Sequence, residues 1–232
     1  MVIAMFLAHL VGDYVLQWDA LASWKARELR GVIVHSVILF VVTALFALPF
    51  DRTWWSGILI IGVSHFAIDA AQFFIKPRIS PLTRFILDQI GHIFFIVLAL
   101  VLGGFLQWGH LWDGILASAQ ATPLLTTFLG YAFITMPAWV LLKFVVYAMV
   151  NGQPPNFPAG PNKFIGITER LIITTLVMFG QFLLVPLVAL PRLIIEWPKV
   201  TDNGSDGIYV VELISSIALA VVVGVGLNLL RL

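Results

Sequence analysis

Long apolar runs separated by short polar breaks dominate the pattern of this chain. The runs cover residues 1–18, 31–49, 55–75, 84–106, 123–150, 165–190 and 208–230. A helix needs about 20 residues, at about 1.5 Å of rise each, to cross the hydrocarbon core of a bilayer. The pattern therefore predicts an all-α polytopic transmembrane helical bundle with about seven spans, of which the first two are short.

The breaks between the runs indicate how the chain is organised. Pro137 and Pro186 fall inside the fifth and sixth runs and are expected to kink them. The segment "QWGHLWDGILASAQ" is read equally well as a short interfacial helix or as a plain loop. We expect a four-span module at 1–106, an outer loop, a fifth span and a Pro/Gly-rich cytoplasmic loop at 107–164, and a two-span segment at 165–232.

Composition agrees with a membrane location and excludes several kinds of chemistry. The 232 residues are 60% hydrophobic and only 11% charged, whereas an ordinary soluble domain has about 25% charged residues. The chain has no cysteine, which excludes disulfides, thiolate zinc sites, iron–sulfur clusters and cysteine catalysis. No basic stretch points to nucleic acid. The expected partners are membrane lipids and other membrane proteins.

The distribution of Lys and Arg predicts the orientation. One set of loops and helix ends holds ten of them, against three on the other side. The positive-inside rule places the larger set in the cytoplasm, so the N-terminus is expected outside and the C-terminus inside. The larger set is Lys25, Arg27, Arg30, Lys76, Arg78, Arg84, Lys143, Lys163, Arg170 and Arg231; the smaller is Arg52, Arg192 and Lys199.

Ionisable side chains recur at matching heights in the first four runs. Three His–Asp pairs are spaced i,i+4, and the order of each pair reverses when the run reverses direction. Residues four apart share one face of a helix. The pairs are His9 with Asp13, His65 with Asp69, and Asp88 with His92, and His35 lies at a similar height in the second run.

Such residues predict a polar site inside the bundle, because a charge at the centre of a bilayer helix costs about 2.5–3.5 kcal/mol. Imidazole and carboxylate are ligands for Zn²⁺, Mn²⁺ or Fe²⁺. One or two divalent ions are expected near the cytoplasmic leaflet, held by His9, Asp13, His65, Asp69, Asp88 and His92.

The leading functional hypothesis is a metal-dependent hydrolase or transferase that acts on a lipid-type substrate. An ion of this kind lowers the pKa of its bound water towards 7. His35 or a remaining carboxylate such as Asp13 is the expected general base, and Arg170 is expected to orient a phosphate.

Other readings of the same residues remain open. The pairs could be structural hydrogen bonds between helices, or a histidine could be the axial ligand of a haem or pigment. Buried His and Asp also mark ion and proton pathways, although no broken helix or repeat is evident in the sequence. A non-catalytic subunit of a larger membrane complex is a further alternative.

The motifs "AHLVGDYVLQ", "SHFAID" and "LDQIGH" resemble a bacterial integral membrane family of unknown function, DUF3307. The resemblance covers about the first hundred residues, and "KFIGITER" and "YVVELISS" resemble later blocks of longer members. It implies a multi-span fold in the bacterial inner membrane and makes the His and Asp positions a family feature. It implies no activity, substrate or metal.

Overall fold

The architecture is helical throughout the residues described by the computed structural model, which are 1–75, 78–150, 157, 162–203 and 206–231. The predicted all-α class is confirmed for these residues. Two compact units divide the chain, Met1–Leu129 and Gly130–Leu232. Each unit has its own cluster of buried apolar side chains.

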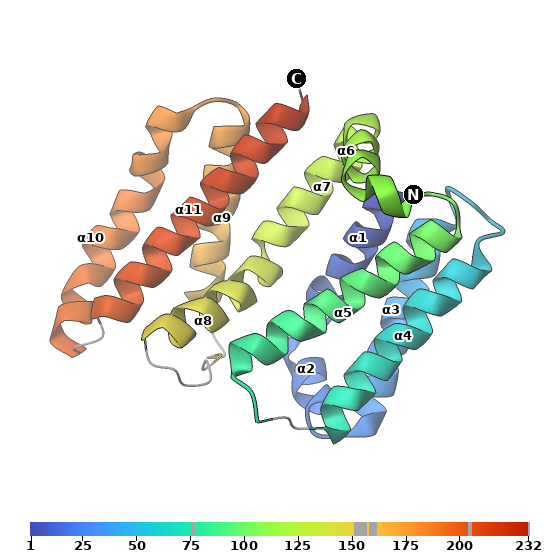
Figure 1. Ribbon diagram of the computed structural model, residues 1–232. Coiled ribbons are helices and arrows are strands. Elements are labelled where there is room, and N and C mark those ends of the chain that lie inside the picture. Colours follow the sequence, from blue (N-terminus) through green and yellow to red (C-terminus); the bar gives the residue numbers. More distant parts are fainter. Residues whose placement is uncertain (76–77, 151–156, 158–161, 204–205, 232) are drawn as a thin grey trace. The chain divides into compact units, whose positions relative to one another are not determined.

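In the N-terminal unit, three long antiparallel helices lie side by side, and the first segment of the chain packs against them (Figure 1). Apolar side chains from these helices form its core. The elements are α1 (Val2–Leu10), the π-helical turn η1 (Val11–Val15), α2 (Asp19–Lys25), α3 (Leu29–Ala47), α4 (Trp55–Phe74), α5 (Pro81–Leu102), η2 (Trp108–His110) and α6 (Leu111–Ala121).

Local sequence signals account for the ends of α5. The Ser80 hydroxyl accepts a hydrogen bond from the Thr83 amide at 3.1 Å, and Pro81 occupies the first turn. Both are typical of a helix start, because the first amides lack intrahelical partners and proline has no amide hydrogen to satisfy. The helix ends before Gly104, whose φ of 76° is readily adopted only by glycine.

In the C-terminal unit, α11 packs along α9 and also contacts α8 and α10. The chain bends by 42° between α7 and α8, next to Pro137, so the predicted kink in the fifth run is present. The elements are α7 (Pro123–Ile134, which contains the division between the units), α8 (Met136–Val150), α9 (Asn162–Met178), η3 (Phe182–Leu184), α10 (Val185–Asn203) and α11 (Asp206–Arg231).

The described residues supply fewer candidate spans than the seven predicted. Four helices are long and apolar enough to cross a membrane, or five if the bent pair counts as one span. They are Leu29–Ala47, Trp55–Phe74, Pro81–Leu102 and Tyr209–Leu230, with the bent pair Pro123–Ile134 and Met136–Val146. Contact between these helices and lipid is therefore expected.

Two predicted spans differ for physical reasons. The first run forms only the shorter apolar stretch Val2–Val15. The sixth run, 165–190, is interrupted at Gly180, whose φ of 74° reverses the chain between α9 and η3. Pro186 therefore lies in the first turn of α10 and does not kink a span.

Two loop predictions have different outcomes. The segment with Trp108 and Trp112 is helical, as η2 and α6, and both Trp side chains are exposed. Most of the predicted Pro/Gly-rich loop at 151–163, like Lys76, lies outside the described residues.

Candidate metal centre

The His and Asp residues singled out in the sequence converge in the N-terminal unit. His9, Asp13, His35, His65, Asp69 and His92 are buried, and Asp88 is half-buried. They come from α1, η1, α3, α4 and α5. Four helices and one turn thus bring imidazole and carboxylate groups from distant parts of the chain into one cluster, which we call the His/Asp cluster.

Three ligand atoms in the cluster have the spacing of a metal site. The distance from His35 Nε2 is 3.0 Å to Asp13 Oδ1 and 3.1 Å to His65 Nε2. The remaining edge, from His65 Nε2 to Asp13 Oδ1, is 3.7 Å. Ligands about 2.0–2.2 Å from one Zn²⁺ lie about 2.8–3.6 Å apart at ordinary bond angles. A single ion therefore fits this triangle with only small side-chain movements.

The number of hydrogens that His35 Nε2 can carry also favours a bound cation. Both short contacts converge on Nε2 of His35, and a neutral imidazole nitrogen is either a donor or an acceptor. Nε2 cannot fully donate to Asp13 while accepting from His65. A shared cation satisfies both contacts at once, because the carboxylate and both rings then act as electron donors.

A second triangle shares His65. Asp69 Oδ2 lies 3.3 Å from His65 Nε2, and Asp69 Oδ1 lies 3.9 Å from His92 Nε2. The rings of His65 and His92 stack with their centroids 4.1 Å apart. Nε2 of His65 has one lone pair and can bind only one ion. The two triangles are therefore alternative positions for an ion that uses His65.

Two of the three i,i+4 pairs are in direct contact, and the members of the first pair meet Gln89 instead of each other. His65 with Asp69 and His92 with Asp88 lie at 3.3 and 3.1 Å. His9 instead lies 3.4 Å from the Gln89 amide oxygen, and the Gln89 amide nitrogen lies 3.5 Å from Asp13. The reason is the π-helical turn Val11–Val15, which rotates Asp13 away from α-helical register. Such turns are frequent at functional sites.

Lys25 is a member of the cluster that sequence reasoning missed. Its Nζ lies 2.8 Å from Asp69 Oδ2. Burial acts to lower the pKa of Lys25, but the carboxylates of Asp13 and Asp69 outweigh it and raise the pKa above its ordinary value. Lys25 is therefore a fixed positive charge beside the ligand atoms.

A close helix contact positions Lys25. A Cβ on Gly31, in the first turn of α3, would lie 2.5 Å from the Lys25 amide nitrogen and 2.5 Å from the Trp24 carbonyl carbon. Only glycine allows the backbone of α2 to approach α3 so closely. No sequence signal pointed to Lys25, because the packing of α2 on Gly31 belongs to the tertiary structure.

Arg170 is placed in the C-terminal unit, where its guanidinium is buried. It donates to the carbonyl oxygens of Ile134 and Thr135, at 2.9 and 3.2 Å, and to the Ser216 hydroxyl at 3.2 Å. Those carbonyls flank the break before Pro137, where regular helical hydrogen bonding is interrupted. The contacts give Arg170 a structural role in satisfying the break, and its role with a phosphate stays a prediction.

Comparison with known proteins identifies the segment that carries the cluster. Residues 1–112 match the model of a family described as a protein of unknown function, DUF3307. The sequence resemblance is thereby confirmed, and the matched segment contains every residue of the His/Asp cluster as well as Lys25. No curated protein and no solved structure matches the chain.

Proposed function

We propose that the segment matching DUF3307 binds one divalent metal ion within the membrane and is a metal-dependent hydrolase or transferase that acts on a lipid-type substrate. The observation that carries the proposal is the triangle of Asp13, His35 and His65, whose ligand atoms are 3.0–3.7 Å apart. The proposal places the site near the cytoplasmic leaflet of the bacterial inner membrane.

The geometry changes the roles expected from the sequence. His35 joins Asp13 and His65 as a proposed ligand, because its Nε2 lies at the shared corner of the shortest contacts. His9 and Asp88 become supporting residues, since both contact the Gln89 amide. Zn²⁺, Mn²⁺ and Fe²⁺ all accept this set of one carboxylate and two imidazoles.

Residues beside the triangle supply the remaining chemistry. A bound ion would lower the pKa of a coordinated water. Asp69 Oδ2 lies 3.3 Å from His65 Nε2 and 3.6 Å from His35 Nε2, beside the triangle, and its other oxygen faces His92. Asp69 and His92 are the proposed pair for accepting the proton of that water. Lys25 Nζ, at 2.8 Å from Asp69 Oδ2, orients that carboxylate.

Elemental analysis of purified protein tests the proposal. We expect about one equivalent of a divalent transition metal in the wild type and loss of that metal in His35→Ala and His65→Ala. His110→Ala is the matched control, because His110 is an exposed histidine of the same unit. Equal metal content in all four proteins would contradict the proposal.

A proton-transfer role is a second candidate, favoured by the continuity of the cluster. Contacts of 3.0, 3.1 and 3.3 Å link Asp13, His35, His65 and Asp69 in series. The break between α7 and α8 is a further feature found in transporters. Proton flux into proteoliposomes, compared between wild type and Asp69→Asn, tests this role, and identical fluxes would exclude it.

A further inference from the structure

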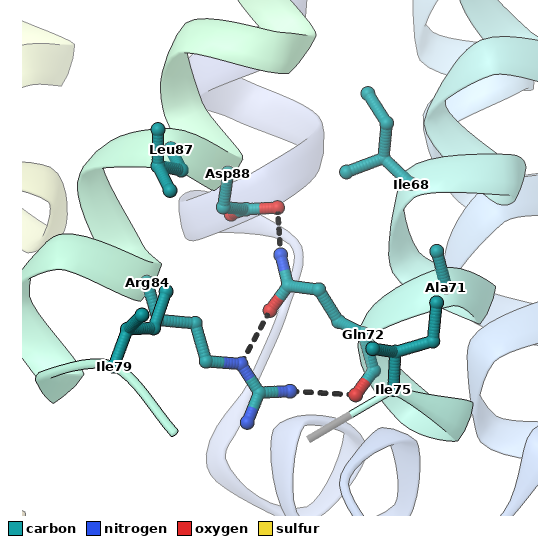
Figure 2. A pocket seen from close by; sticks show the side chains of 8 residues that line it. All are labelled: Ile68, Ala71, Gln72, Ile75, Ile79, Arg84, Leu87 and Asp88. Atoms are coloured by element: carbon teal, nitrogen blue, oxygen red, sulfur yellow. Dashed lines mark hydrogen bonds between the residues drawn. The ribbon is translucent and has the colours of Figure 1, made fainter. Parts of the chain in front are cut away.

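A pocket lies beside the His/Asp cluster, between the cytoplasmic-facing ends predicted for α4 and α5. Its volume is about 280 Å³, close to the lower end of the range of about 300–1,000 Å³ for small-molecule sites. Apolar side chains of both helices and of the turn between them form most of its wall (Figure 2). Ile75, Ile79 and Leu87 at its rim are exposed, so an apolar chain has access from the side.

One end of this pocket is positively charged. Arg84 is half-buried, and its guanidinium is held by Gln72 through the side-chain oxygen at 3.3 Å and the carbonyl oxygen at 2.6 Å (Figure 2). Among the described residues, no carboxylate forms an ion pair with Arg84. A guanidinium has five N–H donors, and the two hydrogen bonds to Gln72 leave three for a ligand.

Gln72 connects this charge to the cluster. Its amide nitrogen donates to Asp88, and Asp88 Oδ1 lies 3.1 Å from His92 Nε2. Figure 2 shows Arg84, Gln72 and Asp88 as a continuous hydrogen-bonded chain along the pocket wall. Gln72 and Asp88 would therefore link a ligand anion on Arg84 to His92 of the His/Asp cluster.

We propose that this pocket binds a membrane lipid whose headgroup carries a phosphate, with the phosphate on Arg84 and the start of one acyl chain along the apolar wall. Three free donors suit a phosphate, which presents at least two acceptor oxygens in a geometry that guanidinium binds bidentately. The exposed apolar rim suits an acyl chain. The idea that this lipid is the substrate of the metal centre rests on the proposed function. The idea that the pocket binds a lipid depends only on the contacts within the pocket.

Lipid binding to delipidated protein in detergent tests the inference. The probes are a short-chain phosphatidic acid, the matching diacylglycerol, and inorganic phosphate, each followed by native mass spectrometry and by thermal stabilisation. We expect phosphatidic acid to bind the wild type and to bind Arg84→Ala at least about tenfold more weakly, the effect of losing a charge-assisted hydrogen bond. Arg78→Ala is the control, because it removes an exposed arginine from the same turn, outside the pocket.

The outcomes separate this inference from the proposed function. Equal affinity of wild type and Arg84→Ala for phosphatidic acid would overturn the lipid site. Equal affinity of the wild type for diacylglycerol and for phosphatidic acid would overturn it too. If inorganic phosphate binds as tightly as phosphatidic acid, the proposed contact between the acyl chain and the apolar wall is overturned. Metal content is measured on the same samples: a metal-free protein with Arg84-dependent lipid binding would refute the metal centre and leave the lipid site supported.

Discussion

Replacing Lys25 by methionine should increase the affinity of the His/Asp cluster for a divalent ion. Lys25 Nζ lies 2.8 Å from Asp69 Oδ2 and supplies a positive charge at the edge of the ligand cluster. An incoming ion is repelled by that charge, and Lys25 also neutralises the Asp69 carboxylate that lies beside the proposed ligands. Methionine keeps much of the side-chain length and apolar stem of lysine but removes the ammonium group, so it isolates the electrostatic effect.

The Lys25–Asp69 distance gives the scale of this effect, because an ion is attracted by the Asp69 charge that Lys25 no longer neutralises in the variant. Two unit charges 2.8 Å apart attract by about 6 kcal/mol at an effective dielectric constant of about 20, and by about 1.5 kcal/mol in bulk water. The Lys25 side chain is 23% exposed and that of Asp69 only 3%, so the pair lies between these limits. Even the lower figure corresponds to about a tenfold change in affinity.

A competition titration against a fluorescent zinc chelator measures the change in detergent-solubilised protein. We expect Lys25→Met to bind Zn²⁺ at least about tenfold more tightly than wild type. Lys143→Met is the matched control, because Lys143 forms an ion pair of the same length, 2.8 Å, with Glu212 in the other unit. Unchanged or weaker zinc binding by folded Lys25→Met would refute the placement of this lysine beside the ion.

Three further predictions concern packing and are checked by thermal unfolding in detergent. Arg170→Met should lower the free energy of unfolding of the C-terminal unit by about 2 kcal/mol, because three buried hydrogen bonds are lost; no change would exclude its structural role. Gly31→Ala should cost about 1–3 kcal/mol and also change zinc affinity, since the added methyl group pushes α2 away. Gly224→Ala should cost a similar amount, because its Cβ would lie 2.7 Å from Val177 Cβ. Gly226→Ala is the control, because a Cβ there meets nothing within 4 Å and should not destabilise the protein. An equal loss of unfolding free energy in both variants would contradict the packing of α9 on α11.

Sequence reasoning succeeded where a signal was local and repeated. The long apolar runs predicted helices, and the i,i+4 pairs of α4 and α5 do face one cluster. His9 and Asp13 also lie in the cluster, but across the π-helical turn each meets Gln89 and not the other. The sixth span was wrong because a single glycine at positive φ ends a helix inside an apolar run that reads as continuous.

The sequence by itself determined that this protein is helical and apolar, and that the His and Asp residues of its first four apolar runs should be buried together. The cost of exposing such groups to lipid does not depend on how the helices are arranged. Only the tertiary structure decided which atoms meet: His35 at the corner of the triangle, Lys25 beside Asp69, and Arg170 on the broken helix. Contacts between distant segments depend on close helix packing and local breaks, which leave no periodic trace in the residue pattern.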